Sequence, residues 1–382
     1  MALIPAPADE RRALGVGLLG YGFMGRAHTN ALRTLPYVFW PSAARPELAG
    51  IAGRTEASVR EAATRFGFAR YTTDWRDLVN DPAVDVFDNV GPDDQHVEPT
   101  LAAIAAGKHV MCEKPLASTA ADAERLYVAA ERAGVQHLTC FNYRFFPAVR
   151  LAWEMLRAGE LGTIHQARFR YSQEWRTDPA VELPSGVGAL DLIGCHAVDQ
   201  ARYLLGEIDT VTAAITSPVT GPDRLVRGVP AEPIDTVSLL AWMVDGPVTT
   251  IDASLVSPGR KNHLAWEING SAGAVAWDLE HPNVLRVFKP GGRTAGFTEV
   301  LVTEADHALM TEWWPSAHVL GWEHGHINMW AHFLRAIAGD DTVTPHAASF
   351  RDGLQAARVA AAVHESAASG ARVAVDRSEP VI

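Results

Sequence analysis

Residues 16–28 read VGLLGYGFMGRAH, in which an apolar strand runs into three spaced glycines and then into a helical segment. In this G-x-G-x-x-G pattern, Gly20 permits a tight turn, Gly22 lets the backbone approach a pyrophosphate, and Gly25 allows close packing of the helix on the strand. The free N–H groups at the start of the helix favour a phosphate there. The stretch predicts a dinucleotide site, to which the intervening residues also contribute: Tyr21, Phe23 and Met24.

Length and composition bound the class of protein. The chain has 382 residues, of which 48% are hydrophobic and 20% are charged, so it can bury the cores of two domains. Its formal net charge of -12 argues against nucleic-acid or acidic-membrane partners, which need a basic surface. No apolar run approaches the roughly 18–20 residues of a membrane span. We expect a globular protein that binds neither nucleic acid nor membrane.

The cysteines and the first residues predict the compartment. Cys112, Cys140 and Cys195 are too few and too scattered for a disulfide framework, which is typical of a reducing cytoplasm. Arg11-Arg12 precedes an apolar stretch and could pass for a twin-arginine export signal. That stretch, however, forms the first strand and the glycine turn of the predicted site. We therefore expect a cytoplasmic protein.

Hydrophobic patterning divides the chain at about residue 142. Before that point, strand-like apolar segments alternate with helical segments, which predicts a doubly wound parallel sheet. After it, residues 211–302 read mostly as strands separated by Gly and Pro turns, and helices at 329–338 and 350–368 close the chain. The predicted fold class is α/β, with a Rossmann dinucleotide-binding domain over 1–142. An α+β domain with a large, mostly antiparallel open sheet follows over 143–382.

A lysine follows the predicted strand at 109–112, within Glu113-Lys114-Pro115. Ligands of open α/β sheets bind at the carboxyl ends of strands, so Lys114 should point into the cleft. Near a nicotinamide, this lysine could orient a substrate hydroxyl or move its proton, provided that burial lowers its pKa. A surface lysine at a strand end is the alternative, and the tripeptide taken alone favours it.

An otherwise apolar segment at 188–205 carries a histidine and two aspartates. Ideal helical spacing puts Leu192, His196 and Asp199 on roughly one face and displaces Asp191 by about 100°. The segment is therefore a candidate catalytic element. A core histidine with satisfied hydrogen bonds is an equally good interpretation of His196.

The glycine loop, Glu113-Lys114-Pro115 and the segment that ends in His196 occur in this order in the Gfo/Idh/MocA oxidoreductases, which the whole chain resembles. The resemblance implies a Rossmann domain and a substrate-binding α/β domain whose open sheet often forms an oligomer interface. A homodimer or homotetramer is the expected assembly. The resemblance also implies NAD(P)-dependent oxidation or reduction of a sugar or cyclitol carbon, with Lys114 and His196 as catalytic residues.

The chain departs from this family pattern before the histidine and in the segment 91–96, where Asp93 replaces an asparagine. The family often has an aspartate four residues before the histidine, where this chain has Leu192, and Asp191 lies one residue earlier. Either Asp191 fills the catalytic role or the site works without that carboxylate. The segment Gly91-Pro92-Asp93-Asp94-Gln95-His96 takes the place of the family's cofactor-lining T-P-N-x-x-H. The resemblance implies further cofactor contacts from Gly91, Pro92, His96, Glu113 and Lys114.

Short aromatic motifs narrow the resemblance. Residues 39–41 (FWP), 141–144 (FNYR) and 171–175 (YSQEW) are similar to those of levoglucosan dehydrogenases and related pyranoside-oxidising enzymes. Sugars are bound by aromatic stacking together with polar side chains. The predicted substrate-binding residues are Lys114, Asn142, Tyr143, Arg144, Trp175, Cys195, His196, His324 and His326, with Trp322 as a further pocket residue. The histidines at 318–332 lack carboxylates or cysteines at ligand spacing, so we expect no metal.

The residues after the second strand bear on the cofactor. An acidic residue there would bind the 2′-hydroxyl of NAD, but the chain has Ala52-Gly53-Arg54-Thr55. Arg54 could accept a 2′-phosphate with help from Thr55, which favours NADP. Arg54 could equally stack on adenine, so NAD stays open.

Three functions are compatible with these residues. The leading hypothesis is an NAD(P)-dependent dehydrogenase that acts on a sugar, glycoside or cyclitol. A redox-neutral, NAD-dependent glycoside-cleaving enzyme would release sugar without a net change in cofactor absorbance. A non-catalytic sensor of NAD(P) and sugar would bind both ligands without turnover, because function does not follow from fold alone.

Overall fold

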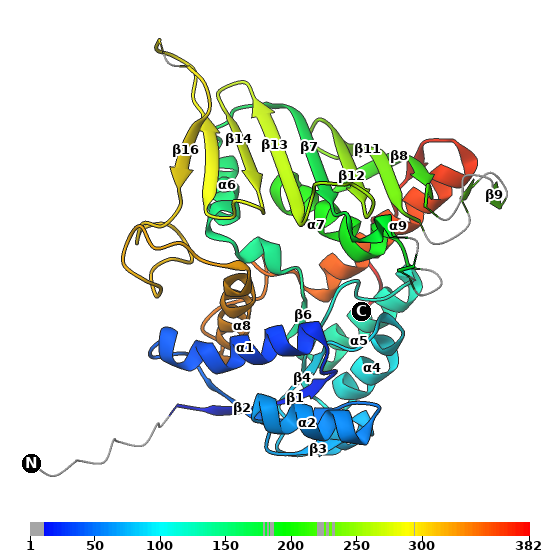
Figure 1. The fold of residues 1–382 in the computed structure, drawn as a ribbon, viewed down its shortest axis with the longest axis vertical. Helices are drawn as coiled ribbons and strands as arrows, with labels where there is room; N and C mark the ends of the chain where they lie inside the picture. The colour runs from blue at the N-terminus through cyan, green and yellow to red at the C-terminus, as the bar shows by residue number, and fades with distance from the viewer. Residues whose placement is uncertain are drawn as a thin grey trace, which may run out of the picture.

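The computed structural model describes residues 11–382 except 179, 182, 184–186, 220–224, 227–228, 231–233 and 294. A six-stranded sheet occupies the N-terminal part, with strand order β3-β2-β1-β4-β5-β6 and parallel pairing throughout. Its strands are β1 (Ala13–Leu19), β2 (Arg45–Ala52), β3 (Tyr71–Thr72), β4 (Val86–Asn89), β5 (His109–Cys112) and β6 (His137–Thr139). This arrangement confirms the predicted doubly wound Rossmann sheet (Figure 1).

Helices connect these strands and cover the sheet. They are α1 (Phe23–Val38), α2 (Glu56–Phe66), α3 (Trp75–Asn80), α4 (Val97–Ala105) and α5 (Ala120–Ala133). Each crossover brings the chain back to start a parallel strand, so the loops that follow β1, β2, β4 and β5 all lie at one edge of the sheet. The glycine loop, Arg54, Gly91 and Lys114 lie in these loops.

A second, nine-stranded sheet follows within the described residues, in the order β16-β15-β14-β13-β7-β12-β11-β8-β17. All its neighbours pair antiparallel except β7 with β12, which confirms the predicted mostly antiparallel sheet. Its strands are β7 (Ile164–Ser172), β8 (Ile208–Thr216), β11 (Thr236–Met243), β12 (Val248–Ser254), β13 (His263–Gly270), β14 (Ala274–Asp278), β15 (Val284–Phe288), β16 (Thr298–Leu301) and β17 (Val373–Ala374). A separate pair consists of β9 (Leu225–Val226) and β10 (Val229–Pro230).

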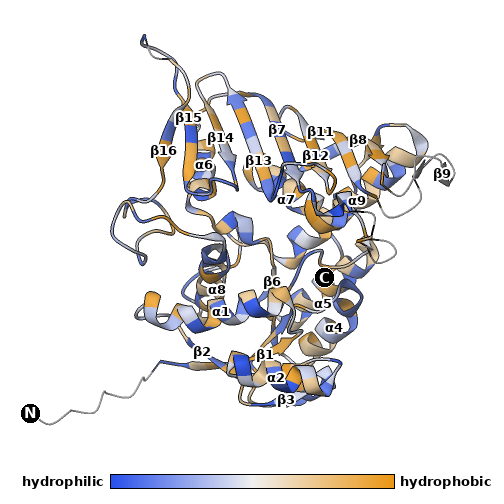
Figure 2. Ribbon diagram, viewed as in Figure 1, coloured by the Kyte–Doolittle hydropathy of each residue, from blue (hydrophilic) through white to orange (hydrophobic). Residues whose placement is uncertain are grey.

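One face of the second sheet is buried under α6 (Pro147–Arg157), α7 (Cys195–Leu205) and α9 (Phe350–Ser369). Buried and more exposed side chains alternate along the central strands β11 and β12, and Figure 2 shows hydropathy alternating along strands of this sheet. The opposite face carries exposed apolar side chains such as Leu240 and Val248. In the described part of the chain, no helix is both long and apolar enough to cross a membrane.

The helix α8 (Trp322–Ala338) returns to the first sheet and packs beside α1 (Figure 1). Its Trp330 and Phe333 are fully buried in one core with Leu14 and Leu32. The C-terminal part of the chain therefore completes one layer over the nucleotide-type sheet. The proposed division of the chain between residues 142 and 143 remains a prediction.

Candidate active site

The glycine loop between β1 and α1 combines an open position with two crowded ones. Gly20 has a φ of +107°, and a Cβ there would lie 2.7 Å from the carbonyl oxygen of Val90. A Cβ at Gly25 would lie 2.6 Å from the carbonyl oxygen of Gly20, whereas one at Gly22 would meet no atom within 4 Å. The loop is therefore tight at both ends and open at Gly22, next to the first N–H groups of α1. This shape fits a dinucleotide pyrophosphate.

The end of β2 forms the neighbouring part of this edge. The ring of Tyr21 lies so close to Gly53 that any side chain at Gly53 would overlap it. Met24 packs partly buried against the same apolar cluster as Tyr21. Arg54 and Thr55 are both exposed, and Thr55 precedes the first turn of α2. These two side chains are free to meet a ligand, as a ribose phosphate would require.

The loop after β4 is tied to the loop after β5 by a buried histidine. The Nδ1 atom of His96 lies 2.7 Å from the carbonyl oxygen of Pro115, and its Nε2 atom lies 3.2 Å from that of Gly91. His96 is fully buried, whereas Pro92 is exposed. The ring therefore holds together the two backbone segments expected to flank a nicotinamide.

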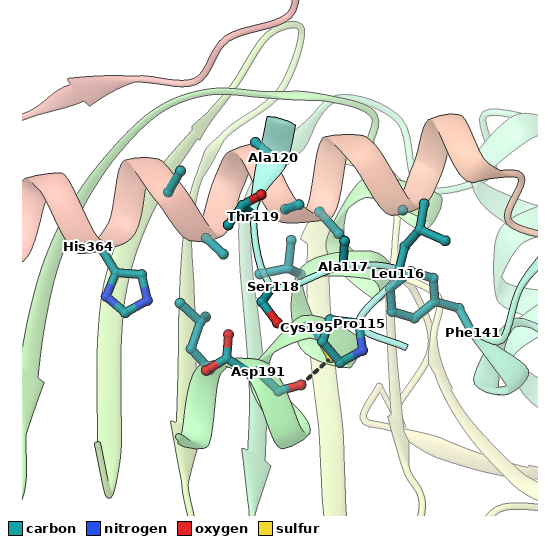
Figure 3. A pocket seen from close by; sticks show the side chains of 17 residues that line it. Pro115, Leu116, Ala117, Ser118, Thr119, Ala120, Phe141, Asp191, Cys195 and His364 are labelled. Atoms are coloured by element: carbon teal, nitrogen blue, oxygen red, sulfur yellow. Dashed lines mark hydrogen bonds between the residues drawn. The ribbon is translucent and has the colours of Figure 1, made fainter. Parts of the chain in front are cut away.

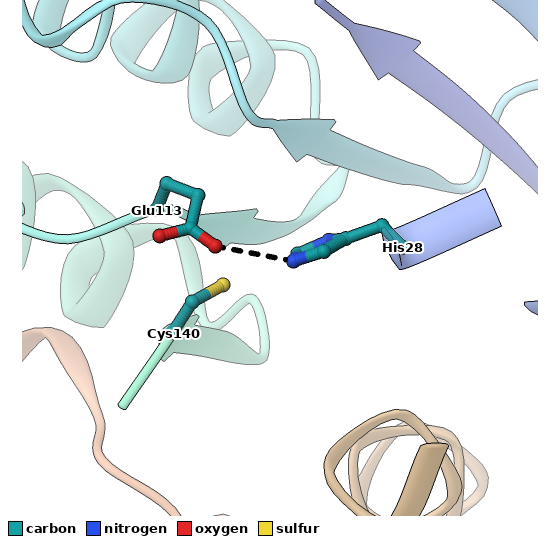
Figure 4. Close-up of side chains that lie close together, drawn as sticks. All are labelled: His28, Glu113 and Cys140. Carbon is teal, nitrogen blue, oxygen red and sulfur yellow. Dashed lines mark hydrogen bonds and ion pairs between the residues drawn. The ribbon is translucent and has the colours of Figure 1, made fainter. Parts of the chain in front are cut away.

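Three buried ionisable groups, which we call the His28 cluster, lie beneath the loop after β5: His28, Asp88 and Glu113. His28 Nδ1 lies 2.9 Å from a carboxylate oxygen of Asp88. His28 Nε2 lies 3.2 Å from Glu113 Oε1, the contact drawn in Figure 4. Burial alone would lower the pKa of His28, but the charges and hydrogen bonds of both carboxylates raise it to about 10. His28 is therefore a buried cation between two carboxyl groups.

The cluster supports the backbone that carries Lys114. Burial would raise the pKa of Glu113, but the hydrogen bond and charge of His28 lower it to about 2. Its Oε2 atom accepts a hydrogen bond from the Lys114 backbone N–H at 3.0 Å. Cys140 also lies beside His28 (Figure 4), but both ring nitrogens of His28 are already engaged by carboxylates. The group is thus a hydrogen-bonded support rather than an open set of metal ligands.

Lys114 projects from this support toward the second sheet. The Lys114–Pro115 peptide bond is cis, and Lys114 Nζ donates a hydrogen bond to the carbonyl oxygen of Leu192 at 2.8 Å. Burial alone would lower the pKa of Lys114, but the acidic groups around it, chiefly Cys195 and Glu113, raise it. The condition for proton transfer by Lys114, a pKa lowered by burial, is therefore not met, because nearby acids outweigh desolvation. Lys114 remains a cation and a hydrogen-bond donor.

The segment before α7 is a π-helical turn, η4 (Leu190–Gly194). A π-turn has more residues per turn than an α-helix, so the expected 100° displacement of Asp191 does not hold here. Asp191 Oδ2 accepts a hydrogen bond from the Gly188 N–H at 3.1 Å. Burial raises the pKa of Asp191, which lines a cavity of about 230 Å³ together with Pro115 and His364 (Figure 3). The Leu192 carbonyl, rather than this carboxylate, meets Lys114.

The first turn of α7 places His196 against an aromatic wall. Its ring centroid lies 4.7 Å from that of Tyr143 and 5.9 Å from that of Tyr171. Burial, together with the positive charge of Lys114, lowers the pKa of His196 well below its usual value. His196 is therefore a neutral imidazole next to a cationic lysine. Cys195 donates to the Asp191 carbonyl oxygen at 3.0 Å, and burial raises its pKa to about 12.

A row of hydrogen-bonded side chains, which we call the tyrosine row, extends from this wall to the surface. Its members are Tyr143, Tyr171, Asn262, Gln173 and Trp175, joined at 2.9, 2.7, 2.7 and 2.6 Å in that order. Trp322 Nε1 donates to the Tyr143 hydroxyl at 3.4 Å, and Phe23 of the glycine loop stacks on the Trp322 ring at 5.3 Å. The wall thus continues to the glycine loop.

The other predicted substrate residues have different surroundings. Arg144 is buried and donates to Asp199 at 3.0 Å and to Asp352 at 2.9 Å, so its guanidinium is held by two carboxylates. Asn142 is also buried, and its Nδ2 atom has no hydrogen-bond partner in the described part of the chain. The structure therefore gives Arg144 an ion-pairing role away from the row.

The two histidines of α8 also differ from each other. His324 Nδ1 accepts a hydrogen bond from the Gly321 N–H at 2.9 Å and so caps the start of the helix. His326 is 1% exposed, and its ring centroid lies 4.6 Å from that of Trp322 and 5.5 Å from that of His28. Burial and the charge of His28 lower its pKa to about 3. His326 therefore connects the His28 cluster to the aromatic wall.

Two adjoining parts of the chain match known families. Residues 14–141 match the family described as an oxidoreductase family with an NAD-binding Rossmann fold, and residues 149–276 match the GFO/IDH/MocA C-terminal domain. The chain belongs to the Gfo/Idh/MocA oxidoreductase family. The resemblance predicted from three short motifs is thereby confirmed.

Relatives of this Gfo/Idh/MocA chain cover most of its length. Levoglucosan dehydrogenase of Pseudarthrobacter phenanthrenivorans is 37% identical over 380 residues, which are 93% of this chain and 96% of that protein. Inositol 2-dehydrogenase of Acidothermus cellulolyticus is 31% identical over 72% of this chain and 76% of that protein. A solved levoglucosan dehydrogenase in complex with NADH and levoglucosan has a TM-score of 0.90 at 36% identity, covering 96% of this chain and 100% of that chain.

Sequence reasoning missed three residues of this Gfo/Idh/MocA site. His28 ends the quoted glycine motif, so its proximity to the loop was a usable signal. Asp88 lies in the buried strand β4, where the sequence does not reveal its partner. Asn262 precedes β13 and lies 91 residues from Tyr171, so only the sheet brings the two together.

Proposed function

We propose that this protein is an NAD(P)-dependent dehydrogenase that oxidises or reduces a ring carbon of a pyranose, an anhydropyranose such as levoglucosan, or a cyclitol. The observation that carries the proposal is the pairing of cationic Lys114 with neutral His196 beside the tyrosine row. Similarity to sugar and cyclitol dehydrogenases supports the substrate class. When bound, the nicotinamide cofactor supplies or accepts the hydride.

The protonation states divide the catalytic roles between Lys114 and His196. Lys114 stays charged and donates a hydrogen bond to the reacting substrate oxygen, which stabilises negative charge there. His196 is neutral at physiological pH and takes the hydroxyl proton during oxidation. In the opposite direction, protonated His196 returns it. Asp191 has no direct part in this scheme.

A main-chain acceptor takes the place of the family's usual aspartate. The Leu192 carbonyl holds Lys114 Nζ at 2.8 Å without adding a second full negative charge. Such a partner orients the ammonium group while leaving its other two N–H donors for ligand. The departure at Leu192 is therefore compatible with catalysis, which favours the dehydrogenase over the non-catalytic sensor.

The proposal also covers the choice between NAD and NADP, which depends on the residues expected to meet the cofactor's ribose. Exposed Arg54 and Thr55, with no acidic residue at that strand end, favour NADP, although a similar solved structure holds NADH.

The open sheet face with Leu240 and Val248 forms the interface of a homodimer or homotetramer, which light scattering would test. The three cysteines are unpaired and buried, in keeping with a cytoplasmic location.

The test is absorbance of the reduced nicotinamide with NAD and NADP against levoglucosan, pyranosides and cyclitols. We expect turnover with one class of sugar. Lys114→Ala and His196→Ala should each reduce kcat by about a hundredfold or more. Sugar release without an absorbance change would instead indicate the redox-neutral glycoside-cleaving enzyme, and ligand binding without turnover would indicate a sensor. Near-normal turnover in both variants would exclude the assigned roles.

A further inference from the structure

The tyrosine row has a hydrogen-bond direction that can be worked out from one end. Trp175 is 40% exposed, and its indole Nε1 lies 2.6 Å from Gln173 Oε1. An indole N–H is always a donor and never an acceptor. The atom of Gln173 that faces Trp175 must therefore be its carbonyl oxygen, because the amide NH₂ cannot accept a hydrogen bond.

The orientation of the Gln173 amide fixes the orientation of each following hydrogen bond in the row. With its oxygen toward Trp175, Gln173 presents its NH₂ group to Asn262 at 2.7 Å, so Asn262 must present Oδ1. The same Oδ1 atom lies 2.7 Å from the Tyr171 hydroxyl, which must donate to it. Tyr171 has only one proton, so at 2.9 Å the Tyr143 hydroxyl must donate to Tyr171. Every orientation in the row follows from Trp175.

The hydroxyl of Tyr143 is therefore left with acceptor capacity alone. Its proton is directed at Tyr171, and Trp322 Nε1 approaches at 3.4 Å as a second donor. In the described part of the chain, these two partners lie at hydrogen-bond distance, and the Asn262 side chain also interacts with this hydroxyl and acts to lower its pKa. The ring of Tyr143 lies 4.7 Å from that of His196, so Tyr143 lies beside the proposed reaction centre.

We infer that Tyr143 is a specificity residue that accepts a hydrogen bond from a substrate hydroxyl, and that the row ending at Trp175 imposes this polarity on it. The inference rests on the proposed function and deepens it. Lys114 can only donate and Tyr143 can only accept, so the pair recognises a ring with two nearby oxygens. The reacting oxygen binds Lys114, and a free hydroxyl next to it donates to Tyr143. A ring with an ether, ketone or fluorine at that second position is disfavoured.

The experiment compares levoglucosan with its monofluorinated deoxy derivatives, because fluorine cannot donate a hydrogen bond. The measurement is the ratio of kcat/KM for levoglucosan to that for each derivative that keeps the reacting hydroxyl. In the wild-type enzyme, one derivative should show a ratio of about ten or more. Tyr171→Phe frees the Tyr143 proton to meet the fluorine, so this ratio should fall several-fold. Tyr143→Phe should lower it at least as far, to the value set by the electronic effect of fluorine alone, which is the same in every variant.

A second variant reverses the hydrogen bond between Tyr171 and Tyr143 without changing either tyrosine. In Gln173→Glu, both carboxylate oxygens are acceptors. The Asn262 amide must then turn so that its NH₂ group takes the place of Oδ1, where it faces both residue 173 and Tyr171. Tyr171 then donates to Tyr143, which becomes free to donate to substrate. This variant should lower the fluorine ratio as Tyr171→Phe does, a change that loss of structural support alone would not produce. Tyr127→Phe, on α5, is the matched control and should leave the ratio unchanged.

The outcomes separate this inference from the proposed function. If levoglucosan is turned over but no fluorinated derivative is penalised, or if the penalty survives in both Tyr171→Phe and Gln173→Glu, the inference is wrong. If no sugar is turned over, the proposed function fails instead. Calorimetric titration of the same sugars into the NADH-loaded protein then replaces the kinetic ratio, and equal affinities would overturn the inference.

Discussion

The His28 cluster and the tyrosine row both bring polar groups next to the proposed reaction centre, yet they are stabilised differently. In the cluster, a charged imidazole lies between two carboxylates, at 2.9 and 3.2 Å. In the row, neutral hydroxyl, amide and indole groups follow one another from donor to acceptor. Charge fixes the backbone that carries Lys114, whereas the neutral row sets which hydrogen bonds a ligand can make.

The difference predicts unequal sensitivity to substitution. A buried charge that loses its partner keeps its full desolvation cost, whereas a neutral hydrogen bond contributes modestly to net stability. Changes in the cluster should therefore lower the free energy of unfolding, and changes in the row should alter specificity while the protein stays folded.

The largest effect is expected for Glu113→Ala. The variant leaves the His28 cation with Asp88 alone and removes the acceptor of the Lys114 backbone N–H. The free energy of unfolding should fall by about 3–5 kcal/mol, measured by urea denaturation. Glu98→Ala, on the exposed surface of α4, is a control that should change it by about 1 kcal/mol or less. Equal losses in the two variants would contradict a buried ion pair.

The charge of His28 also predicts how stability depends on pH. Its pKa rises from 6.5 in the unfolded chain to about 10 in the folded protein. Its stabilising contribution is therefore complete below pH 6.5 and is lost as the pH rises through 10. Thermal unfolding should show a declining Tm over this range, and His28→Gln should flatten that decline. An unchanged slope in the variant would mean that His28 is neutral in the folded protein.

The cofactor side offers an exposed charge for comparison with the buried one. If Arg54 binds a 2′-phosphate, Arg54→Ala should reduce kcat/KM with NADP by about tenfold or more and with NAD by much less. Stability should hardly change, because Arg54 is exposed. Equal losses with both cofactors would favour stacking of Arg54 on adenine. Arg60→Ala, farther along α2, is the matched control.

A small loss of stability is expected for a change in the row itself. Tyr143→Phe removes a neutral hydroxyl bonded to Tyr171, which should cost about 1 kcal/mol in urea denaturation. Its effect on sugar discrimination should be larger than its effect on stability. A loss similar to that of Glu113→Ala would show that the row supports the fold as strongly as the cluster does.

The two regions also differ in how far they could be predicted. Gly20, Gly22 and Gly25 lie within six consecutive residues, so local geometry alone gives their arrangement. The row draws its members from positions 143, 171, 173, 175 and 262, and no local pattern joins Asn262 to Tyr171. Arg144 was expected at the substrate, but it meets Asp352, which lies 208 residues away.

Asp191 shows a third way in which local reasoning falls short. The 100° rule assumes an α-helix throughout, and η4 breaks it where the candidate catalytic residues lie. Lys114 shows the same for electrostatics, because its pKa depends on Cys195 and Glu113 around it rather than on burial alone. Neither the π-helical turn at Asp191 nor the raised pKa of Lys114 can be predicted from residue spacing or residue type.

By itself, the sequence determined the Rossmann sheet, the glycine loop, the position of Lys114 at a strand end and the family, since these depend on periodicity and contiguous motifs. Only the tertiary structure decided which groups are charged, which carbonyl holds Lys114 and which way the hydrogen bonds of the tyrosine row point. Those properties depend on partners brought together from distant parts of the chain, in surroundings where burial makes each electrostatic contact count more.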